Sequence, residues 1–431
     1  MNSQKESNSI LIIADDFTGA NDSGVQLAKK GATANVIFNW YDWQDMTLSQ
    51  PGDVLIINTD SRAVSPQEAA HRQEQVVKQS PLPALIYKKI DSTLRGNIGA
   101  ETSAILSTTQ LPIAIVVPAF PAMGRTTKNG TVYINNVELL KTEFATDPKT
   151  PVHSSRIKEV ILQQTDLACG EVFLPQIRSL NLKQELEKQI QDGKKIIVFD
   201  AEQDSDLKQI MQSVNQLNHP YLLVGSAGLI DHLPVQYQPK QQTTTKSEGK
   251  SLLVIAGSMS HMTQQQIDYT QTHGKGNWQI VDIDIHTLLP KYQPSQLEKY
   301  SQQIQTILQN SDHCIVRTCR DSSLRDFINQ LCQTHHLSRT ELGEHISDFL
   351  GQLTKHVASH LEFGGLFLTG GDIAIAVAQT MGAKGFSIQG EVSSGVPYGQ
   401  LLTDKSATYR VFTKAGGFGS QDIFIKTLEF I

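Results

Sequence analysis

Two adjacent carboxylates, Asp15 and Asp16, follow the first apolar run of the sequence, residues 10–14. In an open α/β sheet, ligands bind outside the carboxyl ends of the parallel strands, so we expect Asp15 and Asp16 to lie at the ligand-binding edge of the sheet. Successive side chains of a strand point to opposite faces, so only one of the two should face the site if the strand extends that far. The alternative is that the pair merely caps the following helix, with Thr18 or Asn21 as the N-cap residue.

The polar segments NTDSR (58–62) and KKIDSTLRGN (88–97) follow the second and third apolar runs, and we expect them to converge beside the two carboxylates. Arg62 or Arg95 can bind a carboxylate through two parallel N–H donors, and a buried Lys89 can neutralise a carboxylate or a phosphate. Hydroxyl groups can be bonded by Asp91, Ser92 and Asn97. Any one segment could be a solvated loop with a surface ion pair, but three at successive strand ends favour a site for a polyhydroxylated anion.

The second half of the chain carries three glycine-rich segments, AGSMS (256–260), LTGGD (368–372) and KAGGFGS (414–420), each between an apolar run and a predicted helix. Backbone N–H groups beside a helix N-terminus bind phosphate. A single Gly-Gly pair commonly only closes a strand-to-helix loop, but three in one half favour phosphate binding. The Walker motif G-x-x-x-x-G-K-[ST] is absent, and the dinucleotide motif G-x-G-x-x-G is absent from this half, so neither a P-loop nor a dinucleotide fold is expected.

Short apolar runs alternate with amphipathic stretches along the whole chain, which predicts an α/β fold of two domains with mainly parallel sheets and a cleft between them. In the first half these runs are 10–14, 54–58, 84–87, 113–117, 196–199 and 221–224; in the second they are 252–256, 314–318, 366–369, 386–392 and 409–413. The turn Asn129-Gly130 predicts a β excursion within residues 121–153. The polar composition of residues 236–249 predicts a linker between domains 1–235 and 250–431.

The composition narrows the classes of partner. The 431 residues include 37 Lys and Arg against 43 Asp and Glu, a net charge of −6, which argues against a nucleic-acid-binding protein. No stretch approaches the roughly 20 apolar residues that span a membrane, and the polar first nine residues do not resemble a targeting segment. The four cysteines are scattered, with Cys314 and Cys319 on one predicted strand, and we expect ordinary core cysteines in a reducing cytoplasm.

Together, the strings ADDFTGANDSGVQLAKKGA, NTDSRA, YKKIDSTLRGNIGAE, AGSMS, GGLFLTGGDIAIAVA and TKAGGFGS closely resemble the four-carbon acid sugar kinase family, in family order from residue 14 to residue 420. Within it, NDSGVQLAKKGA, KTEFATDPKTPV and LFLTGGDIA are most similar to the branch that acts on D-threonate. The alternative substrates are D-erythronate and 3-oxo-tetronate. A non-catalytic nucleotide- or metabolite-binding protein is the alternative from another class.

The resemblance implies an N-terminal domain that binds the acid sugar and a C-terminal domain that binds ATP. The implied substrate-binding residues are Asp16, Arg62, Lys89, Ile90, Asp91, Ser92 and Arg95. The implied ATP-binding residues are Ser258, Gly370, Gly371, Asp372, Ile373, Gly416 and Gly417.

The implied reaction moves the γ-phosphate of ATP to the C4 hydroxyl of the acid. Asp15, Asp16 or Asp91 would orient or deprotonate that hydroxyl, and the sequence leaves the choice among the three open. Mg²⁺ is expected on the ATP phosphates, with no protein ligand assigned. A homodimer is the default expectation for assembly.

Overall fold

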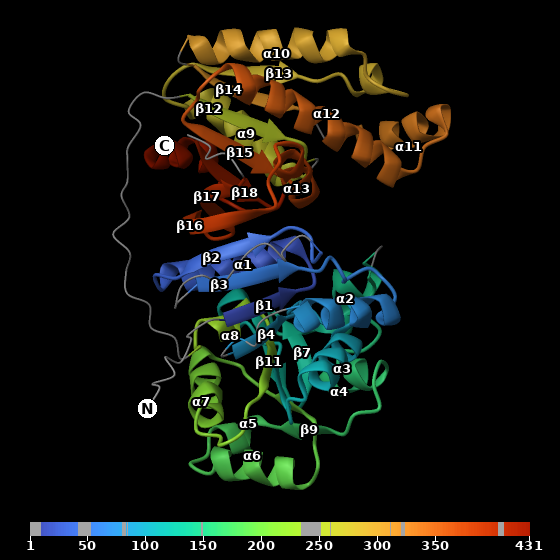
Figure 1. Ribbon diagram of the computed structural model, residues 1–431, viewed down its shortest axis with the longest axis vertical. Helices are drawn as coiled ribbons and strands as arrows, with labels where there is room; N and C mark the ends of the chain where they lie inside the picture. Colours follow the sequence, from blue (N-terminus) through green and yellow to red (C-terminus); the bar gives the residue numbers. More distant parts are fainter. Residues whose placement is uncertain are drawn as a thin grey trace. The chain divides into compact units, whose positions relative to one another are not determined.

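The computed structural model (Figure 1) describes residues 10–41, 53–79, 83, 85–147, 150–233, 251–258, 260–310, 312–319, 324–403 and 409–431. The chain forms two compact units, Met1–Lys240 and Gln241–Ile431. The predicted linker, 236–249, lies outside the described residues, so it stays a prediction.

The first unit is built on an eight-stranded sheet in which every neighbouring pair is parallel. In spatial order its strands are β2 (Thr33–Ile37), β3 (Asp53–Asn58), β1 (Ile10–Ala14), β4 (Leu85–Lys89), β11 (Leu222–Gly225), β5 (Ala114–Val117), β10 (Ile196–Phe199) and β9 (Cys169–Val172). Its helices are α1 (Phe17–Lys29), α2 (Pro66–Gln79), α3 (Ile98–Thr109), α4 (Ile157–Leu162), α5 (Leu174–Ile177), α6 (Leu182–Gln191), α7 (Asp204–Val214) and α8 (Ala227–Ile230). Helices α2 and α3 pack against each other (Figure 1). All five residues of β1 are buried, which explains why the run is continuously apolar rather than alternating.

The chain order of these strands creates a switch point between β1 and β4, which are adjacent in the sheet. From β1 the chain passes through α1 to β2 on one side, whereas from β4 it passes through α3 to β5 on the other side. Adjacent strands whose connections leave in opposite directions open a crevice at their carboxyl ends, which is where α/β sheets bind ligands.

A small antiparallel sheet, β6 (Arg125–Lys128), β7 (Thr131–Ile134) and β8 (Val137–Glu138), departs from the main sheet. The turn from β6 to β7 is Asn129-Gly130, with positive φ at both residues. Positive φ at both central residues is the geometry for which Asn-Gly is favoured, so the predicted β excursion is confirmed.

The second unit contains a seven-stranded sheet. In spatial order its strands are β13 (Trp278–Asp282), β14 (His313–Arg317), β12 (Leu252–Ala256), β15 (Gly365–Thr369), β18 (Arg410–Lys414), β17 (Val396–Leu402) and β16 (Gly385–Ser393). The first five run parallel, and β17 and β16 are antiparallel additions. Its helices are α9 (His261–His273), α10 (Pro294–Gln309), α11 (Leu324–His335), α12 (Arg339–His360), α13 (Gly371–Thr380) and α14 (Ile423–Thr427).

The second sheet repeats the switch-point arrangement, here between β12 and β15. From β12 the chain runs through α9 to β13 on one side of the sheet, and from β15 it runs through α13 to β16 on the other side. The residues that follow these two strands are Gly257 and Gly370, which begin two of the predicted glycine turns. The α/β fold of two mainly parallel units is therefore confirmed.

Two smaller expectations have different outcomes. The strand β14 ends at Arg317, so Cys319 lies beyond it, and the prediction that Cys314 and Cys319 share a strand is wrong. All four cysteines are free and buried, as expected of core residues.

None of the helices in the described part of the chain combines the length and the apolar character needed to span a membrane.

Candidate functional site

The register of the first sheet brings three polar segments to one level. Ala14, the last residue of β1, pairs with Asn58 at the end of β3 and with Lys89 at the end of β4. The residues that follow these three strand ends therefore begin side by side. The expectation that the three segments converge is confirmed by this register.

Asp15 and Asp16 share one arginine. Arg62 donates from Nε to Asp15 Oδ2 at 2.8 Å and from Nη2 to Asp15 Oδ1 at 3.1 Å, a bidentate pair. The same Nη2 lies 2.7 Å from Asp16 Oδ1, which also accepts the backbone N–H of Gly19 at 2.9 Å. Asp16 is thus the N-cap of α1, so the alternative that the pair caps this helix holds for Asp16, whereas its choice of Thr18 or Asn21 as the N-cap residue is wrong.

The two carboxyl groups differ in exposure and in pKa. The side chain of Asp15 is 3% exposed and that of Asp16 is 24% exposed. Burial raises both pKa values, but the charge and hydrogen bonds of Arg62 outweigh it at Asp15, whose pKa falls below its usual range. At Asp16, burial and the nearby charge of Asp15 outweigh Arg62, and the pKa is raised.

Asp91 is held by a second arginine. Arg95 donates from Nε to Asp91 Oδ2 at 2.7 Å and from Nη1 to Asp147 Oδ2 at 3.1 Å, and its guanidinium lies over the ring of Phe144. Burial opposes ionisation of Asp91, but the charges of Arg62 and Arg95 hold its pKa far below the usual range. Asp91 is therefore an ionised, firmly held carboxylate.

The remaining predicted residues of this segment lie at the end of β4. The ammonium of Lys89 is buried and donates to the carbonyl oxygen of Ile90 at 3.1 Å. The backbone N–H of Ile90 donates to Gly225 O at 2.9 Å, which ties the segment to β11. Ser92 is half-buried in the turn that follows. The amide nitrogen of Asn97 donates within the chain, to the carbonyl oxygens of Ser61 and Val64 at 2.9 and 3.0 Å.

Sequence reasoning missed a buried network behind these residues. Lys88 Nζ lies 3.0 Å from Glu101 Oε2, with exposures of 0% and 1%. Glu101 Oε1 accepts hydrogen bonds from Ser61 and Gln73, so the pair is tied to the segment that carries Arg62. The signal was available, because a lysine inside an apolar strand needs a buried partner.

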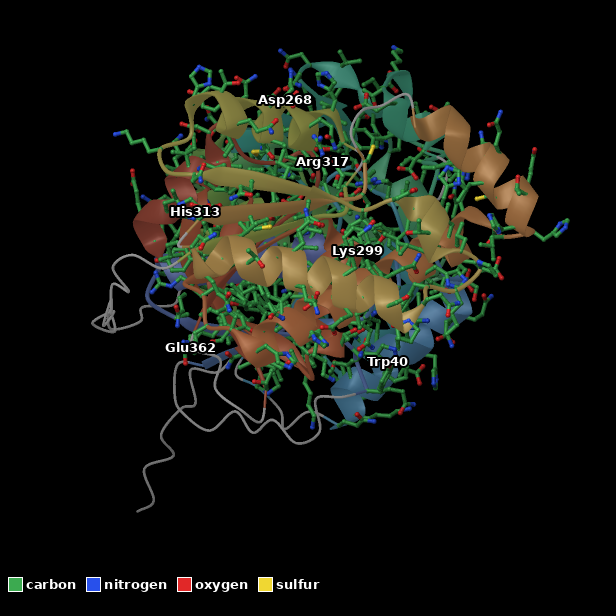
Figure 2. The ribbon with its side chains drawn as sticks, turned by 90° about the horizontal axis from the view of Figure 1, so that it is seen from above. Trp40, Asp268, Lys299, His313, Arg317 and Glu362 are labelled. Carbon is green, nitrogen blue, oxygen red and sulfur yellow. The ribbon has the colours of Figure 1, made fainter. Side chains whose placement is uncertain are left out.

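In the second unit, register again aligns the strand ends. Thr369 at the end of β15 pairs with Ala256 of β12 on one side and with Lys414 of β18 on the other. Ala256 also pairs with Arg317 of β14, whose guanidinium donates to Asp282 at 2.6 Å. Figure 2 labels Arg317 and His313, the two ends of β14.

The predicted nucleotide residues meet at these strand ends. A Cβ added to Gly416 would lie 2.3 Å from Ser258 Oγ, and one added to Gly370 would lie 3.8 Å from Ser258 Cβ. Gly370 has a φ of 103°, which favours glycine, and precedes α13 without a side-chain cap. Gly371, Asp372 and Ile373 form the first turn of that helix. Apart from the two chain neighbours of Gly417, no described residue has an atom within 4 Å of where its Cβ would be, so this part of the turn is open toward the described residues.

Lys414 is a second residue that sequence reasoning missed, although it belongs to the string TKAGGFGS. Its ammonium is buried and donates to Gly416 O at 2.9 Å, Thr263 Oγ1 at 3.1 Å and Ala415 O at 3.2 Å. Burial lowers its pKa from 10.5 to about 7. A lysine placed directly before a glycine turn at a strand end was the available signal.

No group of three or more His, Cys, Asp or Glu residues in the described part of the chain could hold a metal ion. The candidate carboxylates Asp15, Asp16 and Asp91 are paired with arginines instead. A protein-only metal cage therefore does not fit these described residues.

Comparisons with known proteins give one family model for each of the two units of the chain. The model of a sugar-binding N-terminal domain matches residues 10–233, and that of a nucleotide-binding C-terminal domain matches residues 253–424. A D-threonate kinase of Salmonella typhimurium is 41% identical over 428 residues, covering 98% of both chains. A D-erythronate kinase of Heliobacterium modesticaldum is 30% identical, covering 98% of this chain and 97% of its own. A 3-oxo-tetronate kinase of Salmonella typhimurium is 27% identical, covering 97% and 98%.

Solved structures show the same fold. One is a Salmonella typhimurium protein described as a tRNA synthase, with a TM-score of 0.81 at 23% identity, covering 98% of this chain and all of its own. Another, from Haemophilus influenzae, has a TM-score of 0.79 at 22% identity, with coverage of 98% and 100%. At these identities the likeness concerns the fold alone. The two domain models and the full-length 41% identity carry the assignment further, and the chain belongs to the four-carbon acid sugar kinase family.

Proposed function

We propose that this protein is the ATP-dependent kinase that phosphorylates the C4 hydroxyl of D-threonate to give 4-phospho-D-threonate. The observation that carries the proposal is the 41% identity, along 98% of both chains, to a D-threonate kinase. The substrate D-erythronate is the second candidate, supported by the 30% identical D-erythronate kinase.

The charge balance of the first unit suits an anionic substrate. Its candidate site holds three carboxyl groups, those of Asp15, Asp16 and Asp91, and three cationic groups, those of Arg62, Lys89 and Arg95. With all six groups ionised, the three cations offset the three carboxylates, so the carboxylates do not leave the site with an excess of negative charge that would repel an anionic acid.

Among the three carboxyl groups, Asp16 is the candidate for the residue that accepts the hydroxyl proton. Asp15 is bidentate to Arg62 and almost fully buried, and Asp91 is bonded to Arg95 with a strongly lowered pKa. Asp16 is the most exposed of the three, and its raised pKa makes it the strongest base. In the proposed step, the C4 oxygen bonds to the γ-phosphorus, the bond to the bridging oxygen of ADP breaks, and the hydroxyl proton passes to Asp16.

On the nucleotide side, the turns after β12, β15 and β18 are proposed to bind the phosphates. Gly370 provides no side-chain cap for α13, so we propose that the N–H groups of the first turn of this helix bind an anion. Gly416 keeps the third turn in contact with Ser258. Replacement of Gly416 by Val should therefore raise the KM for ATP at least tenfold while the KM for the acid changes little. An unchanged KM for ATP would remove this turn from the proposed site.

Mg²⁺ is proposed to accompany the nucleotide rather than to occupy a protein cage, since no metal-binding group of acidic, His or Cys residues is found in the described chain. Chelation of divalent ions should then abolish transfer but leave the melting temperature of the nucleotide-free protein unchanged. A lower melting temperature on chelation would indicate a resident metal.

The substrate is tested by mixing the protein with ATP, Mg²⁺ and each of D-threonate, D-erythronate and 3-oxo-tetronate, and measuring ADP release. We expect the highest kcat/KM with D-threonate. A higher value with another acid would reassign the substrate. If the protein binds nucleotide but releases no ADP with any of the three acids, the result would favour a non-catalytic binding protein.

We also propose a cytoplasmic location and a homodimer. The four free, buried cysteines suit a reducing compartment. Cell fractionation tests the location and analytical ultracentrifugation tests the assembly. Recovery with a secreted fraction, or a sedimentation coefficient of a 47.6 kDa monomer, would contradict the respective proposal.

A further inference from the structure

The second unit buries a positive charge for which the described residues supply no negative partner. The Nζ atom of Lys414 is bonded to two carbonyl oxygens and one hydroxyl, all neutral acceptors. Among the described residues, no carboxylate forms an ion pair with it. Arg317, at the same edge of the sheet, is by contrast paired with Asp282. Burying an ammonium without a counter-charge costs free energy. The position of Lys414 is therefore unfavourable for its charged form in the nucleotide-free protein.

The geometry places this amine directly behind the proposed phosphate-binding turns. One of its acceptors is the carbonyl oxygen of Gly416, the glycine that touches Ser258. Another is Thr263 in the first turn of α9, and the carbonyl oxygen of Lys414 itself accepts the N–H of Gly370. One lysine is therefore connected to all three turns.

We propose that Lys414 is the charge partner of the nucleotide phosphates, and that nucleotide binding draws a proton onto this buried amine. The inference rests on the proposed function, because it takes the three turns as the phosphate site. A phosphate bound at these turns places negative charge near the amine in a low-dielectric setting and favours the ammonium form. The lowered pKa of about 7 means that the free protein carries the amine partly deprotonated above neutral pH.

Other titratable groups on the surrounding elements are poor sources of the same effect. His261 in the first turn of α9 and Asp372 in the first turn of α13 are exposed to solvent. Arg317 and Asp282 neutralise each other, and Tyr398 on the neighbouring β17 is not bonded to the amine. Burial is the cause of the lowered pKa of Lys414.

Calorimetric titration of the full chain with ADP tests the inference. At pH 8, where the phosphates of the nucleotide are already ionised, the titration is run in two buffers of different ionisation enthalpy. We expect an uptake of at least about 0.4 proton per nucleotide, because an amine with a pKa near 7 starts about one-tenth protonated. We also expect the Kd for ADP to rise by up to about tenfold per pH unit between pH 7.5 and pH 9, since binding takes up a proton.

Two variants separate charge from structure. Lys414→Arg keeps the charge but cannot titrate in this range, so its proton uptake should fall to background while ADP still binds within about threefold of the wild-type Kd. Lys414→Met should lose the uptake and bind ADP at least tenfold more weakly. Lys299→Met is the matched control, because Lys299 is an exposed lysine of the same unit on α10 (Figure 2), and it should behave as wild type.

Proton uptake by the wild type equal to that of Lys414→Met, or wild-type affinity in Lys414→Met, would overturn the inference. Should both Lys414 variants fail to fold, the pH dependence of the wild-type Kd decides, and a flat profile overturns it. Absence of any ADP binding by the wild type would overturn the proposed function itself, and is distinguished by the missing binding heat.

Discussion

At the scale of single residues, two arginines hold carboxylates of their own chain. Arg62 and Arg95 were expected to bind a ligand carboxylate, but Arg62 forms its fork with Asp15, and Arg95 donates from Nε and, at 3.4 Å, from Nη2 to the two carboxylate oxygens of Asp91. These pairs fix two of the three candidate carboxylates and leave Asp16 the most exposed. The difference between the three aspartates lies in their environment rather than in their identity.

Asp16→Asn isolates the proposed proton acceptor. Asn is an equally good N-cap, so α1 should keep its start, whereas the amide cannot accept a proton as the carboxylate does. We expect kcat to fall by about 10² to 10⁴-fold with a small change in the KM for the acid. Wild-type kcat in steady-state assays would exclude Asp16 as the acceptor.

The wild type should also show an acidic limb in kcat. Asp16 must be deprotonated to accept a proton, and its raised pKa moves that limb above the usual aspartate value of 3.8, with activity falling as the pH falls through it. A rate profile with its limb below that value would contradict the assignment.

Arg62→Lys tests whether the fork of Arg62 matters. Lysine keeps one charge but cannot donate two parallel bonds to Asp15 and reach Asp16 as well. We expect the KM for the acid to rise about tenfold or more, and Arg62→Ala to raise it further. An unchanged KM for the acid in both variants would place Arg62 outside the substrate site.

The matched control for Arg62 is Arg178→Lys. Arg178 is bidentate to Asp206 in the same unit, with both distances 2.9 Å, and its partner belongs to α7 rather than to the three polar segments. Its replacement should lower the melting temperature without changing the KM for the acid. A similar rise in the KM for the acid in Arg62→Lys and Arg178→Lys would indicate a general loss of stability rather than a role of Arg62 in the site.

At the scale of elements, the ends of β1, β3 and β4 are held by a buried pair from β4 and α3. Lys88 and Glu101 are buried, and Glu101 bonds Ser61 next to Arg62. Burial and the charge of Asp15 raise the pKa of Glu101, and Lys88 opposes that rise. The Lys88–Glu101 pair is therefore expected to position the segment 58–62, which carries Arg62, as well as to stabilise the fold.

Glu101→Gln leaves the ammonium of Lys88 buried without a counter-charge, and we expect a loss of about 3–5 kcal/mol in the free energy of unfolding. The double variant Lys88→Met with Glu101→Gln should recover part of that loss, since no uncompensated charge remains. Urea unfolding measures both. The exposed pair Lys78 and Glu74, 3.1 Å apart, is the control and should cost no more than about 1 kcal/mol.

If the pair also positions Arg62, the double variant should recover stability without recovering the wild-type KM for the acid. Recovery of both would assign the pair a purely structural role. If the single variant Glu101→Gln lowers the free energy of unfolding by less than about 1 kcal/mol, the expectation of a buried, uncompensated charge is contradicted.

At the scale of the whole molecule, Lys414 should shape the dependence of stability on pH. The pKa of lysine is 10.5 in the unfolded chain and about 7 in the folded one, so the unfolded state binds more protons between these values. This contribution makes the protein more stable as the pH rises from about 7 to about 10.5. Lys414→Met should lack that part of the slope, so its melting temperature relative to wild type should be highest near pH 7 and decline toward pH 10.

Calorimetric melting of wild type, Lys414→Met and Lys299→Met across this range checks the expectation. The difference in slope is the measured quantity, because the hydrogen bonds lost by Lys414→Met cost the same at every pH. Parallel pH profiles for all three proteins would contradict the burial of a titrating amine at position 414.

Much of the architecture was accessible from the sequence because buried parallel strands are continuously apolar. The strands β1, β10 and β12 have the predicted bounds. Four strands were missed: β2, β9, β13 and β17. The strands β9 and β13 lie at sheet edges, β2 is the outermost strand within its own unit, and β17 is an antiparallel addition. These four strands mix polar with apolar residues, so their sequences carry a weaker signal.

The sequence by itself determined the family and the fold class and indicated the segments proposed to carry the chemistry, because each of these depends on residue types and their order along the chain. The tertiary structure decided the pairing of Arg62 with Asp15, the exposure of Asp16 and the burial of Lys414 without a described counter-charge. An arginine has the same chemistry toward a ligand carboxylate as toward its own aspartate. Only the register of the strands and the distances that follow from it distinguish the two.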